Sequence, residues 1–212
     1  MKYLIICLTL LGSTLSYSQD PKADAILDKV SAKIKELKTF YVEFSAIIKN
    51  STNGTNSNLS GKGWVKGDKY CATYGETTLI SNGLKTWSIV KEEKTVYETD
   101  ASSNDEESIN PKKLMTIWET GFKSKYDKEE VLNGEKVHVI YLYPKNPKKA
   151  NYHTIIIYIS KDDNELKKAI MKSNDGTVST FTMTKLTPNP TIEDSKFVFD
   201  KSKYPGYTVV KD

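Results

Sequence analysis

Residues 77–99 read TTLISNGLKTWSIVKEEKTVYET, and polar and apolar side chains alternate through three short runs of this segment. The runs occupy residues 77–82, 86–91 and 95–99. Alternation with a period of two is typical of strands that bury one face. Asn82-Gly83 separates the first two runs, and this dipeptide is a strong signal for a tight hairpin turn. The segment therefore predicts three antiparallel strands joined in chain order.

The same pattern continues on both sides of this segment. Further alternating runs occupy residues 40–49, 59–66, 69–74, 122–128, 136–143, 153–160, 166–173 and 178–186. Turn-forming pairs such as Asn53-Gly54, Asn133-Gly134 and Asp175-Gly176 separate several of them. A sheet of about eleven strands joined by short turns does not remain flat. The sequence predicts a mainly β fold with helices, built on one strongly curved antiparallel sheet.

Two helices are expected to cover this sheet. The first follows Asp20, a suitable cap, and Pro21, which fits the first helical position. Its apolar stripe recurs at steps of three and four residues and includes Ile26, Val30, Ile34 and Leu37. The second is a short helix near residues 111–120, preceded by an acidic loop that we expect to be mobile.

The amino terminus has the pattern of a secretory signal. Lys2 precedes an apolar stretch at residues 3–11, and Ser16 and Ser18 place small side chains where a signal peptidase cleaves. We therefore expect a signal peptide at residues 1–18 and a single domain at residues 19–212. The alternative, a membrane anchor, is disfavoured because the apolar stretch is shorter than the roughly 20 residues that span a bilayer.

Composition argues against several classes of function. All 31 basic side chains are lysine, and 27 acidic side chains nearly balance them, which argues against a nucleic-acid reader. The scattered lysines predict a solvated surface or a weak attraction to anionic membranes. Cys71 is the only cysteine after residue 18, so neither an intramolecular disulfide nor a multi-cysteine metal site is expected.

Catalytic and metal-binding patterns are also missing from the sequence. His138 and His153 have no companion ligand at metal-binding spacing. The chain has neither a Gly-x-Ser-x-Gly elbow nor a glycine-rich loop between a strand and a helix. Clustered carboxylates in the turns indicate solvated acids, with weak calcium binding as the alternative. We expect a monomer that is not an enzyme and has no metal or cofactor.

Four segments together resemble the LolA family of outer-membrane lipoprotein carriers. They are the opening helix with its exit strand (residues 25–30 and 40–44), GKGWVK at residues 61–66, LISNG at residues 79–83 with Trp87, and DSKFVF at residues 194–199. The resemblance implies an unclosed β-barrel capped by helices, whose apolar interior shelters acyl chains. It further implies a periplasmic carrier that accepts acylated lipoproteins from an inner-membrane release complex and passes them to an outer-membrane receptor.

The concave face of a curved sheet is either filled by side chains or left as a cavity. If a cavity exists, the candidate lining residues are Trp64, Ile80, Trp87, Ile89, Leu114, Trp118, Phe181 and Met183. The candidate lid is the stripe Ile26, Val30, Ile34 and Leu37, together with the turn at residues 114–118, and the acidic loop is its candidate hinge.

One feature departs from the family pattern. Family members of the enterobacterial kind close the lid with an arginine just after the strand that ends at residues 65–66, whereas this chain has no arginine and offers Lys69 as a substitute. The alternative function is an envelope lipid-binding or stress-sensor protein that uses the same fold as an interaction surface. If the protein is a sensor, we expect side chains to fill the concave face. If it is instead a small enzyme, we expect a polar cluster inside the barrel.

Overall fold

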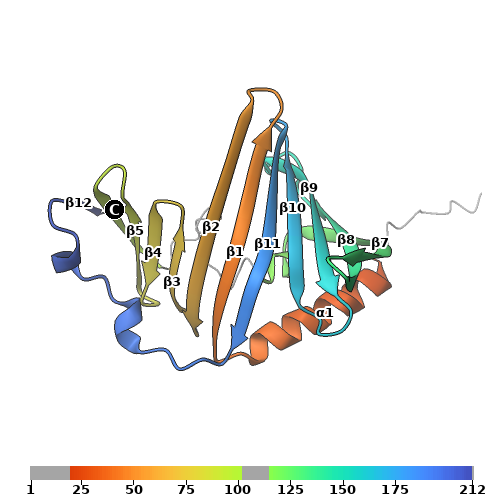
Figure 1. Ribbon diagram of the computed structural model, residues 1–212, viewed down its shortest axis with the longest axis horizontal. Coiled ribbons are helices and arrows are strands. Elements are labelled where there is room, and N and C mark those ends of the chain that lie inside the picture. Colours follow the sequence, from red (N-terminus) through yellow and green to blue (C-terminus); the bar gives the residue numbers. More distant parts are fainter. Residues whose placement is uncertain (1–19, 102–114, 212) are drawn as a thin grey trace, which may run out of the picture.

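The computed structural model describes residues 20–101 and 115–211 (Figure 1). One sheet contains all the described strands, which are β1 (Thr39–Asn50), β2 (Thr55–Lys66), β3 (Lys69–Tyr74), β4 (Thr77–Ser81), β5 (Lys85–Val90), β6 (Thr95–Asp100), β7 (Phe122–Leu132), β8 (Glu135–Pro144), β9 (Tyr152–Ser160), β10 (Leu166–Ser173), β11 (Thr177–Pro188) and β12 (Thr208–Lys211). The described helices are α1 (Pro21–Glu36) and the 3₁₀ turns η1 (Ile117–Glu119), η2 (Asp194–Phe197) and η3 (Lys201–Lys203).

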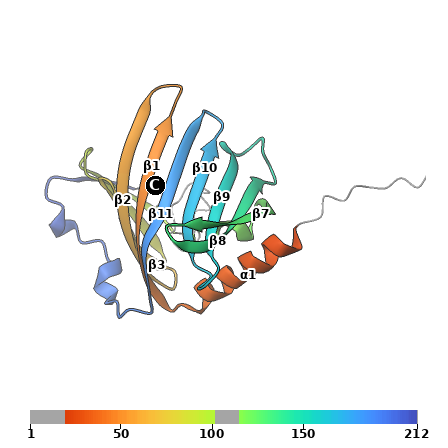
Figure 2. The same cartoon turned by 45° about the vertical axis from the view of Figure 1, so that its right-hand side comes forward.

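The strand order is β12-β6-β5-β4-β3-β2-β1-β11-β10-β9-β8-β7, so two meanders meet where β1 pairs with β11. The sheet is strongly curved and not closed into a barrel, because β12 and β7 remain at its two edges (Figures 1 and 2). The predicted curved antiparallel sheet is confirmed, and each of the eleven expected runs forms a strand. The additional strand β12 pairs in parallel with β6.

Helix α1 lies beneath the half of the sheet that β7–β11 form (Figures 1 and 2). Asp20 caps it as predicted, since its Oδ1 accepts hydrogen bonds from the backbone nitrogens of Lys22 at 3.0 Å and Ala23 at 3.3 Å. Its buried stripe packs against Phe40, Ile140 and other apolar side chains of the sheet. We call the side of the sheet that α1 covers the inner face.

The opposite side, the outer face, has its own covering. After β11 the chain runs through η2 and η3, which we call the C-terminal segment (residues 189–207). Ile192 and Phe197 of this segment pack against an outer-face cluster made of Cys71, Ile80, Trp87, Ile89 and Val96. Adjacent strand residues point to opposite faces, and the neighbours Leu79 and Ile80 accordingly fall in the inner and the outer cluster.

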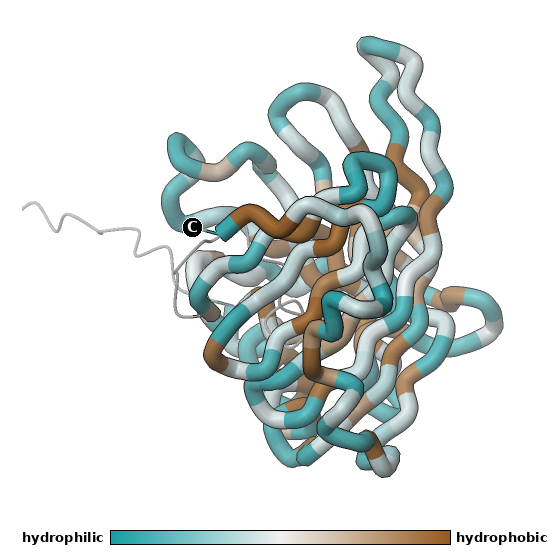
Figure 3. The backbone as a smooth tube through the Cα atoms, turned by 90° about the vertical axis from the view of Figure 1, so that its left-hand side faces the viewer, coloured by the Kyte–Doolittle hydropathy of each residue, from teal (hydrophilic) through white to brown (hydrophobic). Residues whose placement is uncertain are grey.

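Hydrophobic residues recur within the strands, while most hairpin tips are hydrophilic (Figure 3). Leu84, at the β4–β5 tip and 78% exposed, is an exception. The second helix is shorter than predicted in the part that the structure describes, where it is the 3₁₀ turn η1. The proposed signal peptide, the acidic loop with its expected hinge role, and Leu114 lie outside the described residues.

Candidate functional site

The inner face carries apolar side chains that α1 leaves partly uncovered. We call this group the apolar strip, and it consists of Phe44 on β1, Tyr74 on β3, Ala169 and Met171 on β10, and Phe181 and Met183 on β11. The register makes these side chains neighbours, because Phe44 pairs with Met183 and Phe181 pairs with both Ala46 and Ala169. Phe181 is 36% exposed although it belongs to the same side of the sheet as the core.

Gly61 on β2 makes room for the Phe44 side chain of the apolar strip. A Cβ atom at Gly61 would lie 2.2 Å from Cζ of Phe44 and 2.7 Å from the backbone oxygen of Thr73. Since real Cβ atoms do not approach other heavy atoms so closely, the Phe44 ring occupies the space above Gly61. The glycine therefore lets the aromatic ring of Phe44 approach the backbone of β2 closely.

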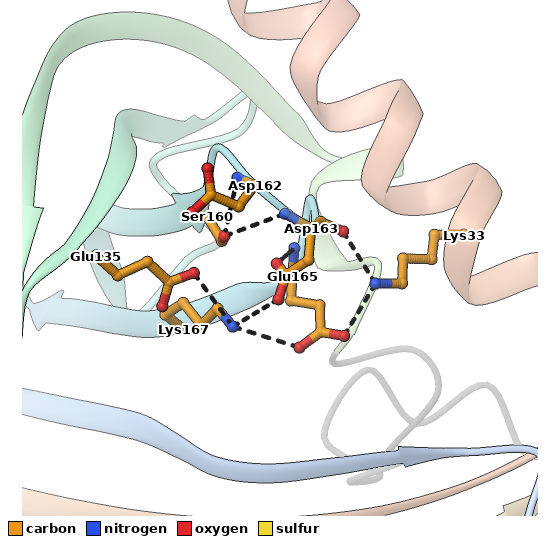
Figure 4. Close-up of polar contacts among 7 residues, drawn as sticks. All are labelled: Lys33, Glu135, Ser160, Asp162, Asp163, Glu165 and Lys167. Atoms are coloured by element: carbon orange, nitrogen blue, oxygen red, sulfur yellow. Dashed lines mark hydrogen bonds and ion pairs between the residues drawn. The ribbon is translucent and has the colours of Figure 1, made fainter.

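Helix α1 is attached to the β9–β10 turn by a set of ion pairs that we call the α1 latch (Figure 4). Nζ of Lys33 donates hydrogen bonds to the backbone oxygen of Asp163 and to Oε1 of Glu165, both at 2.9 Å. Nζ of Lys167 reaches Oδ2 of Asp163 at 2.9 Å, Oε2 of Glu165 at 3.4 Å and Oε1 of Glu135 at 3.4 Å. The latch thus links the last turn of α1 to the β9–β10 turn, and Lys167 extends it to Glu135 on β8.

The electrostatics of the latch favour its charged form. Burial opposes the charge of Asp163, but hydrogen bonds from the Lys167 ammonium and the Glu165 amide outweigh it and lower the pKa of this carboxyl. Burial also opposes the charge of Lys167, yet the hydrogen bond to Asp163 raises its pKa overall. Both partners therefore remain ionised at neutral pH.

The rest of α1 has polar contacts to the sheet and to η1. Oδ2 of Asp20 accepts a hydrogen bond from the backbone nitrogen of Tyr126 at 2.9 Å, which is the main reason that the pKa of Asp20 is lowered. Nε1 of Trp118 donates to Oγ of Ser31 at 2.9 Å, and Lys35 pairs with Glu119 at 2.8 Å. The helix is therefore held along its whole length.

The lid candidates lie where the sequence predicts a covering stripe. Ile26, Val30 and Ile34 are 8%, 1% and 2% exposed in the inner core, and Leu37 packs against them with partial exposure. Trp118, Met183 and the side of β11 that bears Phe181 also belong to the inner face. The structure thus brings part of the predicted set together.

The remaining lining candidates lie elsewhere. Trp64, Ile80, Trp87 and Ile89 belong to the outer face, where the C-terminal segment covers them. The expectation that they share one cavity with Trp118 is wrong, because alternation reveals which residues share a face but not which face a later segment will cover. Their cross-strand pairing is nevertheless continuous: Cys71 pairs with both Trp64 and Ile80, and Ile80 pairs with Trp87.

Lys69 also has a different role from the one predicted. Its Nζ lies 3.2 Å from Oδ1 of Asp194, and Lys66 approaches the same oxygen at 3.1 Å. These ammonium groups lower the pKa of Asp194 through hydrogen bonds. Lys69 therefore contacts the C-terminal segment, and the cations that attach α1 are Lys33 and Lys35 on the helix itself. Sequence reasoning missed Lys33 because its acidic partners are about 130 residues away in the chain.

Two of the surface pockets that the described residues form lie on the outer face. The larger, of about 600 Å³, lies between β1–β2 and the C-terminal segment and is lined in part by Tyr41, Trp64, Lys185 and Lys196. The smaller, of about 250 Å³, is lined in part by Ile89 and Tyr204. Their linings belong to the C-terminal segment and the strands beneath it, so they are separate from the apolar strip.

The histidines are in ordinary polar surroundings. Nδ1 of His153 lies 2.8 Å from Oγ1 of Thr154, and burial lowers the pKa of His138. Within residues 20–101 and 115–211, no group of three or more His, Cys, Asp or Glu side chains could hold a metal ion. In the same residues, no helix is long and apolar enough to cross a membrane.

Comparisons with known proteins place this geometry in a family. Solved structures of similar fold include an uncharacterized conserved protein from Thermus thermophilus (11% identity, 90% of this chain and 99% of that chain covered, TM-score 0.57). LprF from Mycobacterium bovis has 12% identity, 83% and 98% coverage and a TM-score of 0.51. A LolA superfamily protein from Nitrosomonas europaea has 12% identity, 84% and 97% coverage and a TM-score of 0.42.

At these identities the Thermus thermophilus and Mycobacterium bovis structures, with TM-scores above 0.5, show a shared fold and no more. No curated protein matches the chain significantly. The model of the family described as outer membrane lipoprotein carrier protein LolA matches residues 35–200, which is most of the chain. The chain therefore belongs to the LolA family.

Proposed function

We propose that this protein is a periplasmic carrier that shelters the acyl chains of lipoproteins between the inner and outer membranes. The observation that carries the proposal is the apolar strip: Phe44, Tyr74, Ala169, Met171, Phe181 and Met183 stay partly uncovered beside the buried stripe of α1. Family membership supports the same role. The protein acts by binding and release and catalyses no reaction.

The magnitudes suit a reversible carrier. Each acyl methylene removed from water gains about 0.8 kcal/mol, so about ten methylenes gain roughly 8 kcal/mol. This corresponds to a Kd of about 1 μM, before the entropy of association is subtracted. Met171 and Met183 add flexible side chains that adapt to chains of different shape. Binding of this strength protects a chain from water and still allows transfer.

In this proposal α1 is the lid. Opening the helix exposes Ile26, Val30 and Ile34 to water, so the empty protein favours the closed form. An acyl chain that packs against this stripe in the open form replaces the lost contacts and offsets the free-energy cost of opening. The partners that the proposal requires are an acylated lipoprotein, an inner-membrane release complex that loads it, and an outer-membrane receptor that accepts it.

The direct test is to purify the protein, extract it with organic solvent and look for acyl chains by mass spectrometry. Displacement of an environment-sensitive hydrophobic dye by fatty acids gives the affinity. Phe181→Lys should weaken dye binding at least tenfold, because it places a charge in the apolar strip.

Ile47→Lys is the matched control. Ile47 is 42% exposed on the outer side of β1, and Phe181 is 36% exposed on the inner side of the adjoining β11. The control should bind dye like the unchanged protein. If no acyl chain co-purifies and both variants bind dye equally, the carrier proposal fails, and an envelope sensor that uses the sheet as an interaction surface becomes the better explanation.

A further inference from the structure

The outer face of β7–β11 and β1 has a regular pattern that the carrier role does not use. Strand pairing aligns one continuous central row across the sheet: Lys125, Tyr141, Ile156, Ile170, Thr180 and Ile47. This row is apolar except at Lys125 and Thr180. Its exposure is uneven, since Ile47 at the β1 end is 42% exposed and Ile156 on β9 is only 6% exposed.

Lysines flank the central row on both sides. On one side the neighbouring row is Lys123, Tyr143, Thr154, Lys172, Val178 and Lys49. On the other side it is Lys128, Val139, Tyr158, Lys168, Thr182 and Ser45. We call this area the basic face. It contains six lysines (Lys49, Lys123, Lys125, Lys128, Lys168 and Lys172). Two acidic residues lie on the same strand β7: Asp127 is at its bulge, and Glu130 pairs with Lys128 at 2.9 Å.

The basic face also exposes side chains that suit a boundary between water and hydrocarbon. Tyr143 is 38% and Val178 is 37% exposed, and the rings of Tyr141 and Tyr143 stack with centroids 6.2 Å apart. Nζ of Lys168 lies 5.0 Å from the ring centroid of Tyr158. Tyrosine is enriched at membrane interfaces, and lysine lays its apolar stem along such a surface while its ammonium reaches the headgroups.

From this arrangement we propose that the basic face docks on an anionic membrane surface through phospholipid headgroups. The charge of six clustered lysines complements a negatively charged leaflet. Lysine is a point charge without the planar fork of arginine, which suits a diffuse array of phosphates better than one defined carboxylate partner. Neither of the two outer-face pockets described above is lined by residues of the basic face, so the basic face is separate from them.

The placement has a geometric consequence. The basic face and α1 lie on opposite sides of β8–β10, because the core contacts of α1 use the alternate residues Ile140, Leu142 and Ile157 of these strands. A molecule docked by the basic face therefore keeps α1 directed away from the lipid. The proposal does not depend on what the inner face binds.

Co-sedimentation with vesicles tests the docking proposal. The purified protein is mixed with vesicles of phosphatidylcholine alone or with about one third phosphatidylglycerol, at low and at high salt. Each lysine near an anionic surface strengthens binding about fivefold. The double variant Lys168→Glu/Lys172→Glu should therefore bind phosphatidylglycerol vesicles at least 25-fold more weakly, and high salt should weaken binding of the unchanged protein.

The control is Lys29→Glu/Lys201→Glu, which changes the net charge equally at two exposed lysines outside the basic face. It should keep most of the binding, and Ile47→Thr/Val178→Thr should weaken binding through lost apolar contact. Displacement of the hydrophobic dye by soluble fatty acids should be unaffected in all three variants, which separates docking from acyl-chain binding. Equal loss in both charge variants, or no binding to phosphatidylglycerol vesicles at low salt, would overturn the proposal; the second result would make an acidic protein the better partner for this face.

Discussion

The α1 latch makes a sharp prediction about Lys33. Replacing it with methionine keeps most of the aliphatic stem and the helix propensity, but removes the ammonium group. The variant loses the hydrogen bonds to the backbone oxygen of Asp163 and to Glu165, both at 2.9 Å. The carboxylate of Glu165 keeps Lys167 as a partner at 3.4 Å, so no charge is left buried and unpaired.

The expected magnitude follows from the exposure of the partners. The Lys33 side chain is 34% exposed and that of Glu165 is 23% exposed, so solvent screens the pair and its contribution is at most about 1 kcal/mol. The hydrogen bond to the Asp163 carbonyl adds about 1 kcal/mol. A total of about 1–2 kcal/mol raises the open population of the C-terminal half of α1 by a factor of about 5–30.

Hydrogen–deuterium exchange measured by mass spectrometry reports this opening directly. Peptides from α1 should exchange about 5–30 times faster in Lys33→Met, while peptides from β1 and β11 should be unchanged, because local opening leaves the sheet intact. Lys29→Met is the matched control on an exposed position of the same helix. Equal exchange of α1 in both variants would refute the latch, and faster exchange throughout the sheet would show that Lys33 supports global stability instead.

Three further predictions concern packing and charge. Phe197→Ala should lower the free energy of unfolding by about 3–5 kcal/mol in urea denaturation, since the ring is 1% exposed, whereas Val198→Ala, at a side chain 57% exposed, should change it little. Gly61→Ala should lower it by about 1–3 kcal/mol because the added methyl would overlap Phe44, and a stability equal to that of the unchanged protein would contradict the packing described above. The lowered pKa of Asp163 means that its contribution to stability is fully present above the ordinary aspartate pKa of about 4 and is lost as the pH falls through the lower folded value. The urea midpoint of the unchanged protein should therefore fall more steeply below about pH 4 than that of Asp163→Asn.

The strands could be predicted because their signal is local. Alternation and Asn-Gly turns located every strand of both meanders, and Asp20 and Pro21 located the start of α1. Strand β12 was missed because its four residues are held by parallel pairing with β6, more than a hundred residues earlier in the chain. A pattern of period two cannot reveal such a distant partner.

The candidate site was harder to predict for a related reason. Trp64 and Trp87 are the most conspicuous apolar residues of their strands, yet the C-terminal segment covers the face on which they lie. Their positions in the strands predict that both side chains lie on the same face of the sheet. Whether α1 or the C-terminal segment covers that face depends on the path of residues 189–207, which strand alternation does not reveal. The same holds for Lys69, whose partner Asp194 belongs to that later segment.

The two coverings of the sheet differ in what holds them. The C-terminal segment is joined to the outer face by stacked rings, with centroids of Trp87 and Phe199 5.8 Å apart and of Phe199 and Tyr204 5.5 Å apart, and β12 then continues the sheet itself. Removing this covering would expose aromatic rings and break strand pairing together. Helix α1 makes no strand pairing, and several of its polar attachments, among them the Lys33 pair, are partly exposed to solvent. Because α1 can leave the sheet without breaking strand pairing, we expect any ligand-driven movement to occur at α1, beside the apolar strip.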